Sequence, residues 1–266
     1  MTWTLWIQEM TRKKLLRKLI PRLTQIYQSI PDTKGCLENL PTCKSWCCEH
    51  QSPQVLLVEF QNAWGYILRT WTVDQIAGLV EKCIRLYLSR MPTKGCIFWD
   101  RDSFKCQIHK ARCYNCRIYG ITPDEEFNPR YRRFKEAMKG NPLAVIREQC
   151  KLCQTINGTT VTTKDTQRWW DQISELEHEF GVKREHINDS YDGSYRTYHD
   201  HILLAIMPKE IMEDLSRMRM LGSSIDLTRK EQSIQALVNA FRANVNKMVG
   251  EFNESGNDKH AKKSSG

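Results

Sequence analysis

Hydrophobic residues along most of this chain recur three and four positions apart, with polar residues between them. That spacing is typical of helices that bury one face. It predicts an amphipathic helix over residues 8–30, whose polar face is basic and in which Pro21 must start a second helix or kink the first. It also predicts helices over 72–88, with Thr72 as N-cap, and over 164–180.

Elsewhere the pattern changes. Residues 55–68 hold two short apolar runs around an Asn-Ala-Trp-Gly turn signal, which predicts a pair of short strands. The polar and aromatic stretch 188–199 predicts a loop. Helical spacing returns over 200–220 and 228–252, and the serine- and lysine-rich tail 253–266 predicts disorder.

Cysteine is distributed unevenly, which bears on domain organisation. All eleven cysteines lie between Cys36 and Cys153. This composition predicts a cysteine-rich domain over 1–156, including the N-terminal amphipathic helix, and a helical region over 157–252. The predicted fold class is mainly α with minor β: an irregular, metal-stabilised cysteine-rich region followed by a helical C-terminal region.

Neither hydropathy nor the N-terminal residues indicate a membrane span or export. No apolar run approaches the roughly 18 residues of a membrane-spanning helix. At the N-terminus the apolar residues precede the basic run, the reverse of a secretory signal. We therefore expect a cytoplasmic protein.

The formal net charge of +9 is the second compositional signal. A surplus of this size attracts polyanions, so an acidic partner or nucleic acid is one interpretation. The basic residues are dispersed except over 12–22 and 130–133. A solvated basic surface is therefore the simpler interpretation.

Clustered cysteines in a reducing compartment serve metal ligation or redox chemistry rather than disulfides. Thiolates are soft donors that suit zinc, copper(I) and iron–sulfur clusters. Cys83 lies on the apolar stripe of the predicted helix 72–88, so we expect a small core residue there. The predicted metal ligands are the other ten cysteines: Cys36, Cys43, Cys47, Cys48, Cys96, Cys106, Cys113, Cys116, Cys150 and Cys153.

The spacing of these cysteines leaves iron and zinc as alternatives. Cys113-x2-Cys116 and Cys150-x2-Cys153 match the two knuckles of a structural zinc site. The chain also holds two consecutive cysteines, whose side chains point apart and so favour a polynuclear cluster or two neighbouring sites. We therefore favour an iron–sulfur cluster of the 4Fe–4S kind, with zinc as the alternative.

Histidine adds two weaker candidates. His109 follows Cys106 by three positions, a good ligand spacing, but with so many thiols nearby we expect it behind the ligands or at the surface. His199 and His201 alternate, and such a pair faces one metal only on a strand. No carboxylate motif accompanies them, so they are not counted among the ligands.

The order of the cysteine motifs along the chain is similar to that of a known protein family. A Cys-x3-Cys-Cys group, a predicted helix, and then Gly-Cys-Ile-Phe-Trp-Asp, Cys-Gln-Ile-His and Cys-Arg-Ile-Tyr follow in that order. Over residues 36–120 this order resembles the YkgJ-type cysteine-cluster family, which is described as zinc- or iron-chelating and often as an Fe–S oxidoreductase. The resemblance places Cys96, Cys106 and Cys116 at three cysteine positions of that family's pattern.

The family's double cysteine corresponds here to Cys47 and Cys48, with Cys43 and Cys36 as upstream partners. The chain departs from the family's pattern at His109, where an aromatic residue is frequent, and at Cys113, which replaces a proline and adds a potential ligand. Flagellin lysine-N-methylases are similar in carrying such a cysteine segment. The resemblance therefore implies redox or modification chemistry.

We expect a metal-binding cysteine-cluster protein with an iron–sulfur centre, acting as a redox or modification enzyme on an unspecified macromolecular or small-molecule substrate. The alternative is a zinc-stabilised binding module for nucleic acid or protein, without catalysis. No Walker loop, dinucleotide-binding glycine motif, nucleophile elbow or H-E-x-x-H motif occurs in the sequence. The sequence therefore assigns no catalytic residue.

Overall fold

The computed structural model of the chain is mostly helical with a few two-residue strands, which confirms the predicted mainly α fold class. The structure describes residues 3–33, 47–48, 52–88, 95–137, 139, 153–187, 195–206, 213, 215–219, 231–239 and 241–242. Within these residues, no helix combines the length and the apolar character that a membrane crossing requires. The chain forms two compact units, Met1–Asn62 with Lys94–Arg196 and Ala63–Thr93 with Thr197–Gly266.

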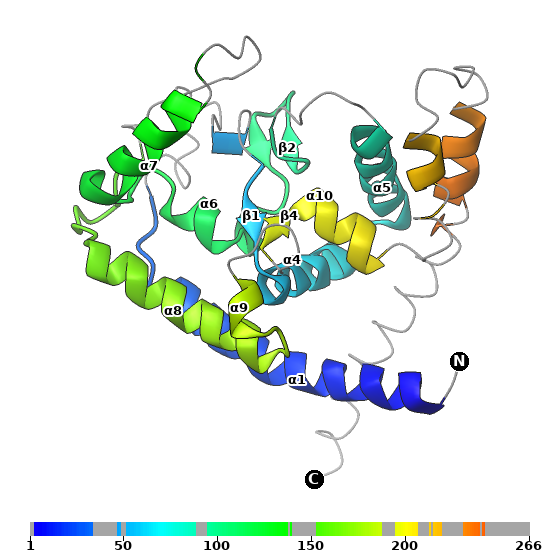
Figure 1. The fold of residues 1–266 in the computed structure, drawn as a ribbon, viewed down its shortest axis with the longest axis horizontal. Helices are drawn as coiled ribbons and strands as arrows, with labels where there is room; N and C mark the ends of the chain where they lie inside the picture. Colours follow the sequence, from blue (N-terminus) through cyan, green and yellow to red (C-terminus); the bar gives the residue numbers. More distant parts are fainter. Residues whose placement is uncertain are drawn as a thin grey trace. The chain divides into compact units, whose positions relative to one another are not determined.

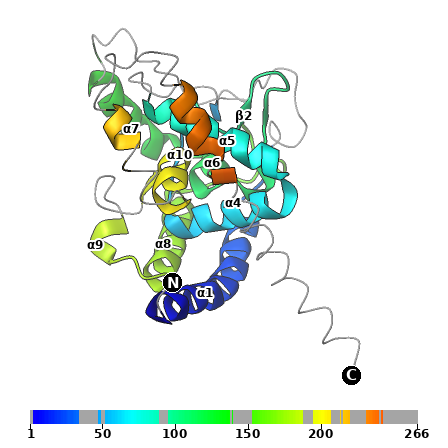
Figure 2. The same cartoon turned by 90° about the vertical axis from the view of Figure 1, so that its right-hand side faces the viewer.

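These units do not follow the sequence-based division at residue 157. Helix α8 (Thr163–Glu179), from the predicted C-terminal region, belongs to the first unit and packs against α1 (Trp3–Gln28). Figure 1 shows the two helices side by side, and Figure 2 shows the same pair from another side. Long-range helix packing, rather than the distribution of cysteine, therefore defines the first unit. The predicted tail 253–266 lies outside the described residues.

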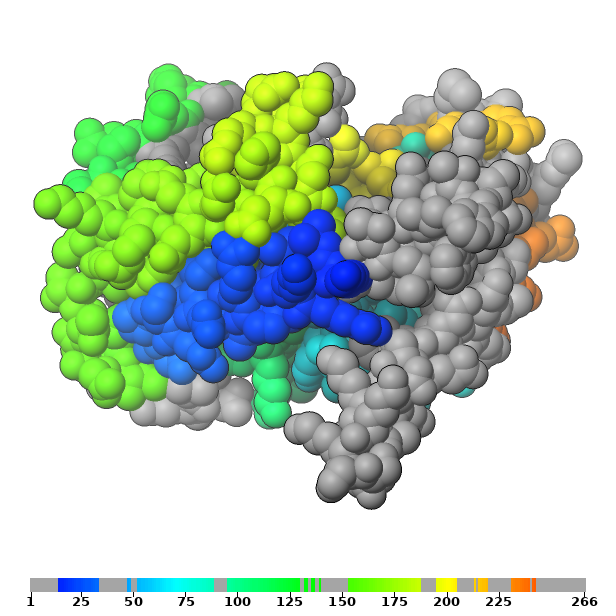
Figure 3. All heavy atoms as spheres, turned by 90° about the horizontal axis from the view of Figure 1, so that it is seen from below, coloured from blue at the N-terminus to red at the C-terminus, as the bar shows by residue number. Residues whose placement is uncertain are grey.

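Helix α1 runs through Pro21 as one helix, which excludes the first of the two alternatives for this proline, a second helix that starts there. Proline offers no N–H to the carbonyl of the residue four positions earlier, which here is Arg17. Arg17 and Pro21 both lie on the exposed side of α1, where water can bond that carbonyl. Figure 3 shows this exposed side of α1 along α8.

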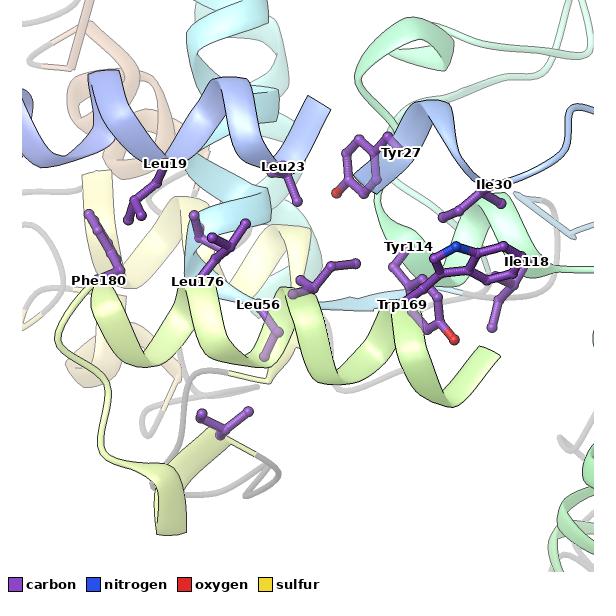
Figure 4. Packing of buried hydrophobic residues seen from close by; sticks show 13 residues of the cluster. Leu19, Leu23, Tyr27, Ile30, Leu56, Tyr114, Ile118, Trp169, Leu176 and Phe180 are labelled. Carbon is purple, nitrogen blue, oxygen red and sulfur yellow. The ribbon is translucent and has the colours of Figure 1, made fainter. Parts of the chain in front are cut away.

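The core of the first unit lies between α1 and α8. Figure 4 shows Leu19 and Leu23 of α1 facing Leu176 and Phe180, with Leu56 beside them. Each such side chain stabilises the fold by about 1.5–3 kcal/mol when fully buried. The cluster consists of Leu19, Leu23, Tyr27, Ile30, Leu56, Val58, Tyr114, Ile118, Trp169, Ile173, Leu176, Phe180 and Ile187.

Local signals at both ends explain why the predicted helix 164–180 is confirmed. At the N-terminus of α8, Asp165 N–H donates to Thr162 Oγ1 (3.3 Å) and Thr162 N–H donates to Asp165 Oδ2 (3.1 Å), a capping box. Gly181 follows the helix with φ +105°, a conformation that favours glycine and ends the helix.

Helix α4 (Leu57–Thr70) replaces the strand pair predicted over 55–68, and that prediction is wrong. No N-cap side chain stands before the helix, since the preceding residue is Leu56. Instead Glu177 of α8, which is fully buried, accepts hydrogen bonds from Leu57 N–H (2.9 Å) and Val58 N–H (2.7 Å). The helix start is therefore satisfied by a residue 120 positions away, which no local pattern reveals.

Short elements complete the description of this part of the fold. β1 (Gln54–Val55) pairs with β4 (Arg196–Thr197), and β2 (Trp99–Asp100) pairs antiparallel with β3 (Lys105–Cys106). After this hairpin come the 3-10 helix η1 (His109–Ala111), α6 (Tyr114–Ile118) and α7 (Asp124–Ala137), and α9 (Arg184–Ile187) follows α8.

The second unit is built on α5 (Val73–Leu88), which confirms the predicted helix 72–88. Thr72 is its N-cap, because Gln75 N–H donates to Thr72 Oγ1 (3.3 Å) while Gln75 Oε1 accepts from Thr72 N–H (2.8 Å). Cys83 is fully buried on α5, and burial raises the pKa of its thiol. The prediction that Cys83 is a core residue is therefore confirmed.

The described residues of the predicted loop 188–199 are partly in regular secondary structure. Residues Arg196–Thr197 form β4, and α10 (Tyr198–His201) begins earlier than predicted, because Thr197 and Asp200 form a capping box. The π-helical segment η2 (Ile202–Ile206) follows and packs against α5. Within the predicted helices 200–220 and 228–252, the described residues 213, 215–219, 231–239 and 241–242 are helical.

Replacing Glu177 by glutamine should lower the free energy of unfolding by about 1–3 kcal/mol. The amide retains one acceptor and turns its NH2 group toward a backbone N–H, so a buried donor loses its partner. Denaturant unfolding followed by circular dichroism measures the change.

Glu175→Gln on the same helix is the matched control. It breaks only the exposed ion pair with Arg184 (2.6 Å) and should cost about 0–1 kcal/mol. Equal losses in the two variants would contradict the capping role of Glu177.

Candidate metal centre

Six of the predicted ligands lie in three segments of the first unit. Cys47 and Cys48 occupy a short helical stretch. Cys96 lies in the turn before β2, and Cys106 ends β3, where it pairs with Trp99 across the hairpin. Cys113 is the N-cap of α6, and Cys116 lies in its first turn. No disulfide joins any of the cysteines among the described residues.

The first close group joins Cys47, Cys48 and Cys106. The Sγ atoms of Cys47 and Cys48 are 3.9 Å apart. A hydrogen bond with the Cys106 thiol, then one with Cys47, then burial raise the pKa of Cys48 well above its usual range. Residues 47–48 are thus brought to the β2–β3 hairpin although they are far from it in the sequence.

The second close group joins Cys113 and Cys116, whose Sγ atoms are 3.5 Å apart. The hydrogen bond between them is the largest cause that raises the pKa of Cys116, followed by burial. The charges of Cys96 and Cys106 raise the same pKa further. Cys106 therefore contacts Cys48 in the first group and lies near enough to Cys116 in the second for its charge to act there.

Backbone hydrogen bonds fix the thiol-bearing segments to one another. Cys96 N–H donates to Cys48 C=O (2.6 Å), and Trp99 N–H donates to Cys96 C=O (3.1 Å). Gln107 N–H donates to Phe98 C=O (2.9 Å), which closes the hairpin beside Cys106. The approach of the thiols therefore follows from backbone structure and does not depend on side-chain rotamers alone.

A buried carboxylate anchors the start of α6, next to Cys113. Glu59 Oε1 accepts hydrogen bonds from Tyr114 N–H (2.6 Å) and from the Tyr27 hydroxyl (2.6 Å), and its Oε2 accepts from Leu56 N–H (3.1 Å). Burial raises the pKa of Glu59, and the hydrogen bonds from Tyr27, Tyr114 and Leu56 oppose the shift. Glu59 therefore connects α1, α4 and the cysteine-bearing helix α6.

Positive charge accompanies the thiols. The guanidinium of Arg117 lies over the Tyr27 ring (4.2 Å to the centroid) and donates to Arg112 C=O (3.0 Å). Burial, the largest effect, and Arg112 lower the pKa of Arg117, whereas Tyr27, Cys113 and Asp32 raise it. Arg112 is itself 5% exposed. Arg117 therefore places a buried cation near Cys113, whereas Arg112 pairs with Asp32 (3.8 Å).

His109 contributes a buried nitrogen that has no hydrogen-bond partner among the described residues. Its Nε2 atom lies in η1, three residues after Cys106. A buried ring nitrogen without a partner is costly, and a metal, a bound water or a further ligand satisfies it. The sequence prediction that His109 lies behind the ligands or at the surface is not tested by this arrangement.

The donor set fits a thiolate-bound metal in its chemistry. Six soft sulfur donors, the Arg117 cation near Cys113 and the buried His109 nitrogen all lie between residues 47 and 117 of the first unit. Within the part of the chain that the structure describes, no three Cys, His, Asp or Glu side chains meet closely enough to hold a metal ion. Ligation therefore requires the close groups to draw together around Cys106.

The other predicted ligands are placed elsewhere or not described. Cys36, Cys43 and Cys150 lie outside the described residues. Cys153 is buried, two positions before Thr155, which forms an isolated bridge with Thr33. The predicted knuckle Cys150-x2-Cys153 therefore stays a prediction.

The His199 and His201 pair lies on the helix α10 rather than on a strand. Residues two apart on a helix point to different sides, so one metal does not bridge them. Thr197 Oγ1 lies 2.9 Å from His199 Nδ1, and burial lowers the pKa of His199 while Asp200 raises it. These contacts give His199 a structural role at the start of α10.

Sequence reasoning missed the residues that support the thiols. Glu59 stands in an otherwise apolar run between Val58 and Phe60, which is the one local signal that could have marked it as a buried, partnered charge. Tyr27 and Arg117 carry no comparable signal, because their contact joins residues far apart in the chain.

Comparisons with known protein families, with curated proteins and with solved structures find no significant match. The resemblance of residues 36–120 to the YkgJ-type cysteine-cluster family therefore stays an expectation that rests on the motifs alone. The geometry of the thiols is the basis on which a function can be argued.

Replacing Arg117 by methionine removes the charge beside Cys113 and retains most of the apolar stem. We expect metal affinity to fall about 10- to 100-fold, as is typical when a residue that supports metal ligands is changed. Competition with a chelator measures the affinity.

Arg168→Met is the matched control, since Arg168 is exposed and also lies over an aromatic ring, that of Trp169 (5.7 Å). Its metal affinity should equal that of the wild type. Wild-type affinity in a folded Arg117→Met variant would exclude a supporting role for the guanidinium.

Proposed function

We propose that the first unit holds a thiolate-bound metal centre, an iron–sulfur cluster of the 4Fe–4S kind, and that the protein uses it in a redox or modification reaction. The observation that carries this proposal is the presence of two close groups of thiols, which come from three separate segments of the first unit. Cys106 interacts both with Cys48 and with Cys116, and Cys96 acts on Cys116 as well. Thiols gathered without disulfides are typical of metal ligation.

The number of candidate thiols favours iron over zinc. A structural zinc ion needs four ligands, whereas six of the predicted cysteine ligands lie between residues 47 and 117 of the first unit. Cys47 and Cys48 do not discriminate between the two metals. Their sulfurs are 3.9 Å apart, so the expectation that consecutive cysteine side chains point apart is wrong for this pair.

The chain's own residues then have distinct tasks. Cys48 and Cys113 are buried and would exclude water from their side of the centre, whereas Cys106 and Cys116 are half-buried. Arg117, near Cys113, would offset part of the negative charge of the thiolates. When bound, an iron–sulfur cluster supplies single-electron transfer or a Lewis-acidic iron.

A zinc-stabilised binding module is the second candidate, and the exposed cations favour it. Lys14, Arg17 and Lys18 are exposed on α1, and Arg132 and Arg133 are exposed on α7. Such surfaces attract polyanions by long-range electrostatics. In this case the metal would stabilise the fold and the helices would present the basic surface.

Anaerobic purification with metal and sulfide analysis separates the two candidates. We expect a coloured protein with stoichiometric iron and acid-labile sulfide, whose removal by a chelator lowers the melting temperature, because metal binding adds to folding stability. A colourless protein that carries zinc alone would reject the iron–sulfur proposal and leave the binding module.

Substitution of single cysteines tests the ligand assignment. Cys106→Ser and Cys116→Ser should each remove most of the bound metal, since both residues belong to the gathered thiols. Cys83→Ala is the control from the core of the second unit and should retain full metal content. The molar ratio of metal to protein in each variant is measured by inductively coupled plasma mass spectrometry. Loss of metal in Cys83→Ala, or its retention in both serine variants, would contradict the assignment.

A further inference from the structure

Cys113 and Cys116 form the closest thiol pair for which the structure gives a distance, with 3.5 Å between their Sγ atoms. We propose that this pair is also a dithiol site that closes to a disulfide when a small-molecule disulfide reacts with it, and that closure releases the metal. The inference rests on the proposed function, because release requires that the two thiols hold the metal.

The backbone separation suits a disulfide. Residues three apart in an α-helix have Cα atoms about 5 Å apart, inside the range of about 4.4–6.8 Å that disulfides require. Cys113 is the N-cap of α6, and Arg117 N–H donates to Cys113 C=O (3.1 Å), so the pair has this helical spacing. Bond formation needs the sulfurs to approach by about 1.5 Å.

The other close pair is less suited to a disulfide. Cys47 and Cys48 are consecutive, and neighbouring Cα atoms lie about 3.8 Å apart across a trans peptide bond. That separation is below the disulfide range of about 4.4–6.8 Å, so closure would strain the backbone. Their Sγ atoms are also farther apart, at 3.9 Å. Oxidation is therefore directed to Cys113 and Cys116.

The surroundings hold the pair in place during closure. Tyr114, between the two cysteines, donates its N–H to the buried Glu59 (2.6 Å) and its hydroxyl to Thr166 C=O (2.8 Å). Asn115 donates its Nδ2 to Gln54 C=O (2.7 Å). The turn that carries the thiols is thus fixed by contacts that the disulfide does not disturb.

The difference in exposure sets the order of the two steps. Cys116 is half-buried and Cys113 is 0% exposed. The Cys116 thiol loses its proton, and its sulfur attacks one sulfur of the small-molecule disulfide, whose S–S bond breaks and whose other half leaves as a thiolate. Cys113 then loses its proton, attacks the Cys116 sulfur and expels the second half as a thiolate. Two electrons pass from the protein to the small-molecule disulfide, and neither cysteine sulfur is then a thiolate that could hold a metal.

The sequence makes this disulfide easy to detect. Arg112 precedes Cys113 and Arg117 follows Cys116, so trypsin releases residues 113–117 as one peptide with two cysteines. Anaerobically purified wild-type protein is treated with increasing glutathione disulfide, alkylated with iodoacetamide, digested and analysed by mass spectrometry. The peptide with free thiols carries two alkyl groups, whereas the disulfide form carries none and is two hydrogen atoms lighter.

We expect the lighter peptide to appear in proportion to the metal released, and to appear equally in the Cys83→Ala control. Metal release while residues 113–117 remain doubly alkylated would overturn the inference and leave the metal proposal intact. A disulfide found instead in the peptide with Cys47 and Cys48 would overturn it too.

The two proposals fail in different ways. If the purified protein carries no metal, the proposed function is rejected and so is the release step. Mapping of the 113–117 peptide still shows whether the disulfide forms, because this measurement does not need bound metal. If metal is present and a thiol-specific oxidant leaves both metal and peptide unchanged, the dithiol site alone is rejected.

Discussion

Two buried carboxylates hold the thiol-bearing part of the protein together, because they accept hydrogen bonds from the N-terminal N–H groups of α4 and α6. Glu177 of α8 accepts the first N–H groups of α4, and Glu59, within the first turn of α4, accepts the first N–H of α6. Each bond joins an anion to a helix N-terminus, where the partial positive charge of the backbone favours it. The position of α6, and with it Cys113 and Cys116, therefore depends on α8 through α4.

Contacts among Glu59, Tyr27 and Arg117 explain how polar and charged side chains near the thiols can be buried. Burial of a carboxylate, a phenol and a guanidinium is costly unless each has partners. Glu59 bonds Tyr27, and Arg117 lies over the ring of Tyr27 and beside Cys113. The three groups satisfy one another and at the same time set the electrostatic environment of the sulfur atoms. The same set of contacts thus stabilises the fold and positions the candidate site.

The sequence predicts the elements whose signals are local. Periodic apolar residues and caps such as Thr72 define α5 and α8 correctly, and the burial of Cys83 follows from its place on an apolar stripe. Helix α4 was not predictable in the same way, because its cap comes from Glu177. The candidate site follows this division: cysteine spacing identifies the donors, whereas Glu59 and Arg117 depend on contacts between distant residues.

The 120 positions between Leu57 and Glu177 have a consequence for synthesis. Chains emerge from the ribosome N-terminus first, at about 5–20 residues per second. All the gathered thiols leave the ribosome before Glu177 does, so the nascent chain exposes them while the start of α4 is still uncapped. The final arrangement of the sulfurs thus waits for α8, and the newly made cysteines are open to oxidants or to a metal donor during that delay.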